Sequence, residues 1–208
     1  MKILGIDPGY GIVGYGVIEK DQRGKCTLID YGAIKTPTDE TFPIRLAIID
    51  EAIKRLIDKH NPDAVAVEEL FFNTNITTGI KVAEARGVIV CAAVRECSEL
   101  YEYTPAQIKL AITGTGKAEK RQVQYMTKVM LNLKDIPRPD DAADALAVAL
   151  THAQTNNKLV NNSMMQFEKL KSGRKKGTTQ SSNLQKLIRQ AQMRETINKN
   201  KRKLNNDI

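Results

Sequence analysis

The stretch from Arg138 to Leu150 constrains the fold of this chain more than any other. It reads Arg-Pro-Asp-Asp-Ala-Ala-Asp-Ala-Leu-Ala-Val-Ala-Leu. Pro139 suits the first turn of a helix, and Asp140 or Asp141 can serve there as an N-cap or as a first-turn acid favoured by the helix dipole. The residues that follow are good helix formers and nearly all apolar, so we expect a helix that other elements cover.

Two acids at the entrance of this helix form an unusual pair. Asp141 and Asp144 are three residues apart, so their side chains lie on the same helix face. Two carboxylates repel each other, and each is costly to desolvate unless a cation lies between them. The simpler interpretation is one capping acid and one exposed acid.

Carboxylates also end two predicted strands. Asp7 closes the apolar run that begins at Lys2, and Glu68 and Glu69 follow the run Ala64–Val67. Taken singly, such an Asp starts a turn and such a Glu faces solvent. Taken with the helix acids, they form a set of oxygen ligands without a His or Cys cluster, which suits a hard cation such as Mg²⁺ or Mn²⁺.

The remaining hydrophobic pattern predicts a mixed α/β domain. We expect strands over residues 2–7, 11–20, 26–36, 63–68 and 100–104, and helices over 43–60, 77–98 and 107–112, with a further helix ending near 132 before the one described above. Short links make the first three strands antiparallel neighbours. The unbroken Ala-Val-Ala-Val of the fourth strand is typical of a strand buried on both faces.

The helix over residues 77–98 is apolar or small on nearly every side. A helix of this kind is covered all round. In a small domain this indicates the sheet on one face and a second subunit on the other.

A glycine-rich run, Gly114-Thr-Gly-Lys-Ala-Glu-Lys-Arg121, precedes another helix. It is not a Walker A loop, because Ala118 stands where Ser or Thr must hold magnesium. It can still hold a phosphate through backbone N–H groups and the charges of Lys117, Lys120 and Arg121. The alternative is a solvated basic turn.

Composition places the chain in a broad class. Cys26, Cys91 and Cys97 lack metal-site spacing and indicate reduced thiols in a cytoplasmic protein. His60 and His152 read as ordinary surface or helix-end residues. We expect no signal peptide and no membrane span.

Charge divides the chain in two. Residues 158–208 hold 13 Lys and Arg against 3 Asp and Glu, a net +10, whereas residues 1–157 hold 19 bases and 21 acids, a net −2. We therefore predict a folded domain over 1–155 and a basic, flexible extension over 156–208 with one conditional helix near 184–193. Nucleic acid, an acidic membrane surface or improved solubility would each explain such a tail.

The order of strands and the positions of the acids resemble the RNase H-like nucleases, and the motifs resemble the RuvC family of Holliday junction resolvases. The matching segments are Gly5-Ile6-Asp7-Pro8-Gly9, Gly14-Tyr15-Gly16-Val17-Ile18, Val67-Glu68 with Phe71, Ala85-Arg86-Gly87, Ala118-Glu119-Lys120 with Gln122-Val123, and Asp141-Ala142-Ala143-Asp144-Ala145-Leu146-Ala147. The resemblance covers about residues 1–153 and leaves the tail without a counterpart. It implies an RNase H-like five-stranded sheet, three antiparallel strands followed by two parallel ones, flanked by helices.

The same resemblance implies an activity: metal-dependent nicking of two strands of a four-way DNA junction, in recombination and repair. It implies Asp7, Glu68, Asp141 and Asp144 as ligands of two Mg²⁺ ions, with Mn²⁺ as a substitute. Lys120 would act at the scissile phosphate. The implied DNA contacts are Phe71, Lys109, Lys117, Lys120 and Arg121. A homodimer and a branch-migration complex of the RuvA/RuvB type are the implied partners.

Three alternatives stay open from sequence alone. A YqgF-type nuclease shares the Gly-Ile-Asp-Pro-Gly start, although the Asp-Ala-Ala-Asp helix and Glu68-x-x-Phe71 favour RuvC. An actin-like or sugar-kinase ATPase needs more chain than 208 residues. A non-catalytic junction-binding module would not need four acids. Phe71 can also be a core anchor, in which case Phe72 becomes the candidate DNA contact.

Overall fold

In the computed structural model of the chain, residues 1–70, 76–97 and 99–155 are described. The strands are β1 (Lys2–Asp7), β2 (Ile12–Lys20), β3 (Cys26–Lys35), β4 (Ala64–Glu68) and β5 (Leu100–Tyr103). The helices are α1 (Phe42–His60), α2 (Ile76–Glu96), α3 (Pro105–Thr113), α4 (Lys120–Met130) and α5 (Asp140–Gln154). Each predicted element is therefore present, with ends that differ by a few residues.

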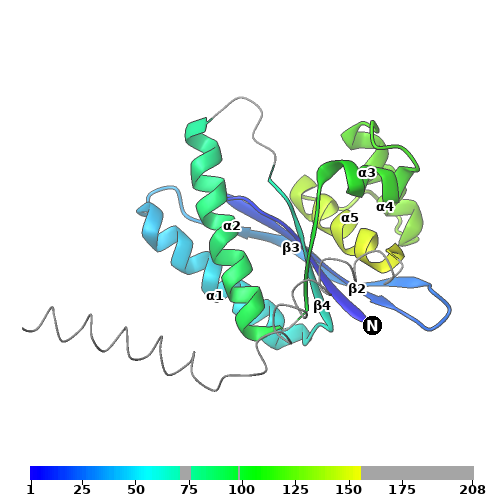
Figure 1. Ribbon diagram of the computed structural model, residues 1–208, viewed down its shortest axis with the longest axis horizontal. Helices are drawn as coiled ribbons and strands as arrows, with labels where there is room; N and C mark the ends of the chain where they lie inside the picture. The colour runs from blue at the N-terminus through cyan, green and yellow to red at the C-terminus, as the bar shows by residue number, and fades with distance from the viewer. Residues whose placement is uncertain (71–75, 98, 156–208) are drawn as a thin grey trace, which may run out of the picture. The chain divides into compact units, whose positions relative to one another are not determined.

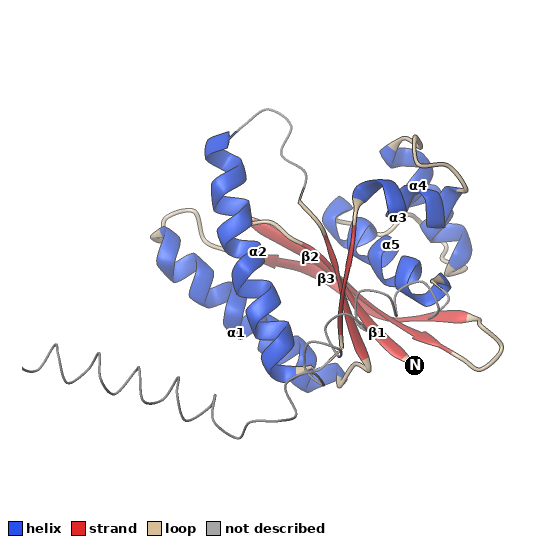
Figure 2. Ribbon diagram, in the orientation of Figure 1, coloured by secondary structure: helices blue, strands red, loops and turns tan. Residues whose placement is uncertain are grey.

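The strands form one mixed sheet in the order β3-β2-β1-β4-β5 (Figures 1 and 2). β1 pairs antiparallel with β2, and β2 pairs antiparallel with β3, because the links between them are short. β4 pairs parallel with β1 and with β5. This confirms the expected α/β sheet of three antiparallel strands followed by two parallel ones.

Helices cover both faces of the sheet. α1 and α2 pack on one face, against the buried side chains of Leu4, Ile6 and Val65. α3, α4 and α5 pack on the other, where Ile3 and Leu146 lie in the core. The side chains of each strand alternate between the two faces, so one strand serves both cores.

Glycines let α5 lie directly on the sheet. A Cβ atom built on Gly5 would lie 2.2 Å from the backbone oxygen of Ala145, and one on Gly14 would lie 2.0 Å from that of Asp141. Any larger residue at either position would push the helix away. The N-terminus of α5 is thereby held beside β2 and the end of β1, where Asp7 pairs with Gly14.

The two histidines lie at helix ends, which is one of the two positions expected for them. Both rings are buried there: His60 hydrogen-bonds to Asp30, and His152 hydrogen-bonds to the hydroxyl of Tyr103. Each ring has a hydrogen-bond partner that lies far away in sequence, which composition alone does not reveal. The N-cap of α5 is Pro139, so Asp140 and Asp141 are first-turn acids.

α2 packs toward the sheet with one face, and its other face is exposed within this chain; the second subunit expected on that face stays a prediction. Ala85, Ile89 and Ala92 are buried, but Ile80 and Val94 are more than half exposed. No helix in the described part of the chain is long and apolar enough to cross a membrane. The predicted extension over 156–208 lies outside the described residues, and the division at residue 155 stays a prediction.

Candidate active site

Two acids meet at the carboxyl ends of β1 and β4. The two strands are parallel neighbours in register, with Ile6 opposite Val67, and Asp7 and Glu68 follow directly. Side-chain alternation turns both carboxylates toward α5, away from the face that α1 and α2 cover. The two side chains share a hydrogen bond.

α5 adds a third carboxylate. Asp144 lies on the first turns of this helix, where the contact of Asp141 with Gly14 holds the backbone against the sheet. The side chain of Asp144 is 20% exposed. Its carboxylate forms an ion pair with Lys120 Nζ at 2.6 Å. Lys120 is the first residue of α4, so one cation from a neighbouring helix reaches the acidic group.

The cluster carries more negative charge than its surroundings compensate. Burial, followed by the charges of Glu68 and Asp144, holds the pKa of Asp7 well above its ordinary value. Burial and Asp144 raise the pKa of Glu68 to about 7, and burial also raises the pKa of Asp144 despite Lys120. Burial lowers the pKa of Lys120, but the contact with Asp144 outweighs this and raises it. These shifts indicate a place for additional positive charge.

The acids open into a cleft of about 380 Å³. Its lining residues are Asp7, Glu68, Pro105, Ile108, Lys109, Lys120, Val123, Asp144 and Ala147. Lys109 and Lys120 thus line the same cleft as the carboxylates; their contacts with DNA stay a prediction. The apolar wall from α3 and α4, which includes Ile108 and Val123, was not predicted, because helical spacing alone marks those residues only as core.

Asp141 stands apart from the other three acids. It does not line the cleft, although its charge contributes to the raised pKa values of Asp7 and Asp144. Within the described ranges, no three His, Cys, Asp or Glu side chains are grouped closely enough to hold a metal ion. The contacts explain this arrangement, because Glu68 is bonded to Asp7 while Asp144 is turned to Lys120.

The predicted phosphate loop lies beside the cleft. Lys117 and Arg121 are exposed and do not line it. Gly114 takes a left-handed conformation at the end of α3, with φ 79°, and Glu119 stands at the N-cap of α4. Since a carboxylate occupies that N-cap position, Lys117 and Arg121 are better placed for long-range attraction than for a phosphate cradle. Phe71 and Phe72 lie outside the described residues.

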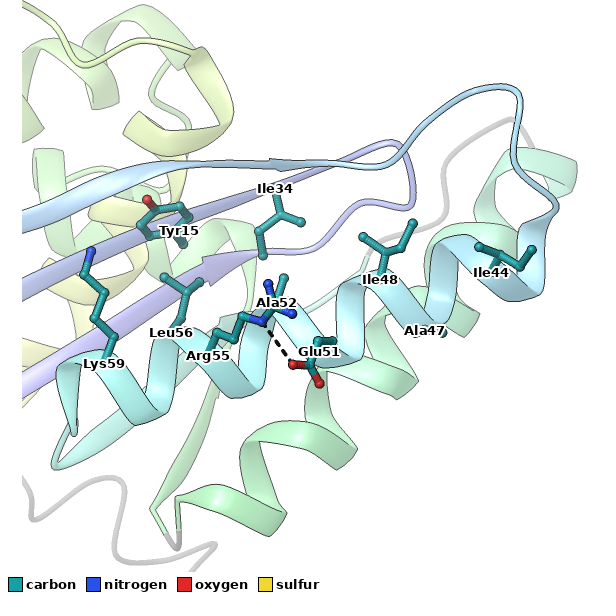
Figure 3. A pocket seen from close by; sticks show the side chains of 10 residues that line it. All are labelled: Tyr15, Ile34, Ile44, Ala47, Ile48, Glu51, Ala52, Arg55, Leu56 and Lys59. Atoms are coloured by element: carbon teal, nitrogen blue, oxygen red, sulfur yellow. Dashed lines mark hydrogen bonds and ion pairs between the residues drawn. The ribbon is translucent and has the colours of Figure 1, made fainter.

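A larger hollow on the opposite face has a different character. It measures about 580 Å³ and runs between α1 and strands β2 and β3, where Tyr15, Ile34 and Ile48 point into it (Figure 3). The charged residues at its margin include Glu51, which is paired with Arg55 in Figure 3. An apolar groove whose acid is already paired offers no ligands for a cation, so the smaller acidic cleft is the candidate active site.

Comparison with known proteins gives matches over most of this chain. The family model described as crossover junction endodeoxyribonuclease RuvC matches residues 3–152. The crossover junction endodeoxyribonuclease RuvC of Alkaliphilus metalliredigens is 55% identical over 157 residues, which are 76% of this chain and 95% of that protein. The one from Alkaliphilus oremlandii is 51% identical over 157 residues, with the same shares covered.

A solved structure, Thermus thermophilus RuvC in complex with Holliday junction substrate, superposes with a TM-score of 0.70 at 38% identity. The match covers 74% of this chain and 93% of that one. These matches select RuvC over the YqgF-type and ATPase alternatives. The chain belongs to the RuvC family of crossover junction endodeoxyribonucleases.

Proposed function

We propose that this protein is a structure-specific endonuclease that resolves four-way DNA junctions by metal-dependent hydrolysis in the acidic cleft. The observation that carries the proposal is the group of carboxylates Asp7, Glu68 and Asp144, whose charge is only partly neutralised by Lys120. Membership of the RuvC family supplies the substrate, since a relative at 38% identity is solved with a Holliday junction.

The donor set fits magnesium. Mg²⁺ and Mn²⁺ prefer carboxylate oxygens, and a cation among these side chains would relieve the repulsion that raises their pKa values. We infer two ions per active site, held by Asp7, Glu68, Asp144 and Asp141. When bound, the ions supply Lewis-acid activation of a water molecule and neutralise charge on the phosphate. Asp7 and Glu68 would give up the proton of their hydrogen bond, and Asp144 would give up part of its contact with Lys120.

The side chains of the cleft divide the remaining work. Asp7 lies on the central strand and reaches both neighbouring acids, which suits a shared ligand. Lys120, released from Asp144, would stabilise negative charge that develops on the scissile phosphate. Lys109 at the opposite margin would orient that phosphate. We assign Phe71 to stacking on a junction base, as the family resemblance implies.

A symmetric junction requires two cuts, which a two-fold dimer with one cleft in each subunit would supply. The exposed face of α2 is our candidate interface. Ile80, Ala83, Gly87, Cys91 and Val94 share this face at spacings of three and four residues, and all five are exposed. Replacing Ile80 and Val94 by Glu should shift the protein to monomers in analytical ultracentrifugation; an unchanged dimer would place the interface elsewhere. A branch-migration complex of the RuvA/RuvB type is the further proposed partner.

The basic extension has a separate proposed role. Residues 158–208 carry +10 and residues 1–157 carry −2, so the extension should supply most of the long-range attraction to DNA. Removing residues 158–208 should weaken binding to junction and duplex alike and flatten the dependence of affinity on salt. An unchanged salt slope on duplex DNA would favour docking of a partner protein instead.

The proposed activity is tested by incubating the full chain with a labelled four-way junction and a matched linear duplex. With Mg²⁺ we expect paired nicks in two strands of the junction and none in the duplex. Ca²⁺ should allow binding without efficient cutting, because it holds the same oxygens with looser geometry. Equal cutting of the duplex, or binding without cutting in Mg²⁺, would reject the proposal; the second result would favour a non-catalytic junction-binding module.

A further inference from the structure

A cluster of aromatic and basic side chains lies at the loop that follows Asp7, on the α1–α2 side of the sheet. Tyr10 stands three residues after Asp7, so their Cα atoms are at most roughly 11 Å apart. The ring of Tyr10 meets the ring of Phe42 edge to face at 6.0 Å. The guanidinium of Arg45 lies 4.8 Å from the Tyr10 ring centroid, and Lys81 Nζ lies 5.7 Å from it and 5.8 Å from that of Phe42.

The loop that carries Tyr10 is fixed in place. Thr36 donates its hydroxyl to the backbone oxygen of Tyr10 at 2.7 Å, and its own N–H binds the oxygen of Gly11 at 3.1 Å. Arg45 donates to the Thr36 hydroxyl at 2.8 Å and to the oxygen of Tyr10 at 3.3 Å. Arg45 therefore acts mainly as a tie between α1 and the loop that leaves Asp7.

Lys81 differs from Arg45, because its ammonium group contacts the two rings but forms no ion pair with a described acid. It is exposed and makes no hydrogen bond or ion pair with any described residue. Two ring faces hold its ammonium group, which limits the entropy lost when an anion binds. Residues 71–75, outside the described part, contain no acid that could pair with it.

The helix ends around Lys81 strengthen the positive potential. The first turns of α1 and α2 contain no acid, and the side chain of Thr41 makes no capping hydrogen bond at the start of α1. Both helices thus direct the positive ends of their dipoles toward this region. Asp39 and Glu40 precede α1, but neither forms an ion pair with Arg45 or Lys81.

We infer that Lys81, held over Tyr10 and Phe42, binds a phosphate of the DNA backbone next to the cleft, on the side opposite Lys109 and Lys120. This inference rests on the proposed function and extends it. A strand whose scissile phosphate faces Asp7 would then have basic contacts on both sides of the cut. Arg45 is the positioning residue, because it fixes the loop that carries the Tyr10 ring.

The test is the affinity of the full chain for a labelled four-way junction in EDTA, measured by fluorescence anisotropy from 50 to 200 mM salt. Lys81→Gln should bind more weakly than the wild type, with a salt slope smaller by about 0.9. The loss of affinity should therefore shrink by about 3.5-fold between the lowest and the highest salt. Lys81→Arg should retain the wild-type slope.

Lys54→Gln is the matched control, since Lys54 is exposed on α1 and forms no ion pair among the described residues. It should leave the slope and the affinity unchanged. If Lys81→Gln behaves like Lys54→Gln while the wild type binds and cuts junctions, the phosphate site is wrong and the proposed function stands. A fall in melting temperature for Lys81→Gln without a change in slope would assign the cluster to packing alone. If the wild type fails to recognise junctions, the proposed function itself fails.

Discussion

Partly buried acids at two places in this molecule have pKa values that are shifted in opposite directions. On β3, Asp30 accepts hydrogen bonds from Lys59 Nζ at 2.8 Å and from His60 Nε2 at 2.9 Å. Burial alone would raise the pKa of Asp30, but these two partners outweigh it and lower the pKa. At the end of β1, Asp7 faces Glu68 and Asp144, and its pKa is raised.

The two pKa shifts differ because Asp30 has enough positive charge around it and Asp7 does not. The Asp30 group is neutralised within the chain, and it ties the end of α1 to an edge strand. The three acids of the Asp7 group share Lys120 and Lys109, yet the pKa values of all three acids stay raised, so the protein bears a cost that a bound cation would remove. Strained electrostatics of this kind are typical of functional sites, where stability is exchanged for activity.

The largest expected effect separates the two groups by activity. Asp7→Asn keeps the shape of the side chain but removes a charged ligand, so junction cleavage should fall by about 10²–10³-fold or more. Junction binding should persist. Cleavage and gel-shift assays on the same samples measure both, and residual cleavage within about tenfold of the wild type would exclude Asp7 as a metal ligand.

The second largest expected effect is a loss of stability when Asp30 is removed. Asp30→Ala removes the acceptor of the buried His60 ring, and leaving such a group unpaired costs about 1–3 kcal/mol of unfolding free energy. Cleavage should be unchanged. Glu51→Ala is the control, because its pair with Arg55 is exposed and should contribute less than about 1 kcal/mol. Equal unfolding free energies for both variants would show that the tie to β3 is unimportant.

A smaller effect should appear as a pH dependence. The pKa of Glu68 is raised to about 7 in the folded protein from an ordinary 4.5, so the folded state binds this proton more tightly than the unfolded state. The associated stability is complete below pH 4.5 and is lost as the pH rises through about 7. In metal-free urea unfolding, Glu68→Gln should therefore gain stability relative to the wild type across that range. A constant difference at all pH values would contradict the raised pKa.

Sequence reasoning recovered the architecture because its signals are local. The apolar runs that end in Asp7 and Glu68, and the apolar helix that carries Asp144, each appear within about a dozen residues. Parallel pairing of β1 with β4 then brings the acids together. The family resemblance supplied their roles.

What the sequence did not reveal depends on contacts between distant segments. The partner of His60 is thirty residues away on β3, and that of His152 is on β5. Asp141 was predicted as a metal ligand, yet its side chain does not line the cleft with the other three acids. Tyr10 and Lys81 meet only because α2 begins beside the loop after β1. The periodicity and spacing of the sequence do not predict contacts of this kind.

We propose that the cleft at the end of β1 is a cation site because its carboxylates lack compensating charge. Calorimetric titration of MgCl₂ or MnCl₂ into the full chain at pH 8 tests this without DNA. We predict saturable binding to the wild type, loss of that binding in Asp7→Asn, and retention in Asp30→Ala. Equal binding by the wild type and Asp7→Asn would contradict the claim.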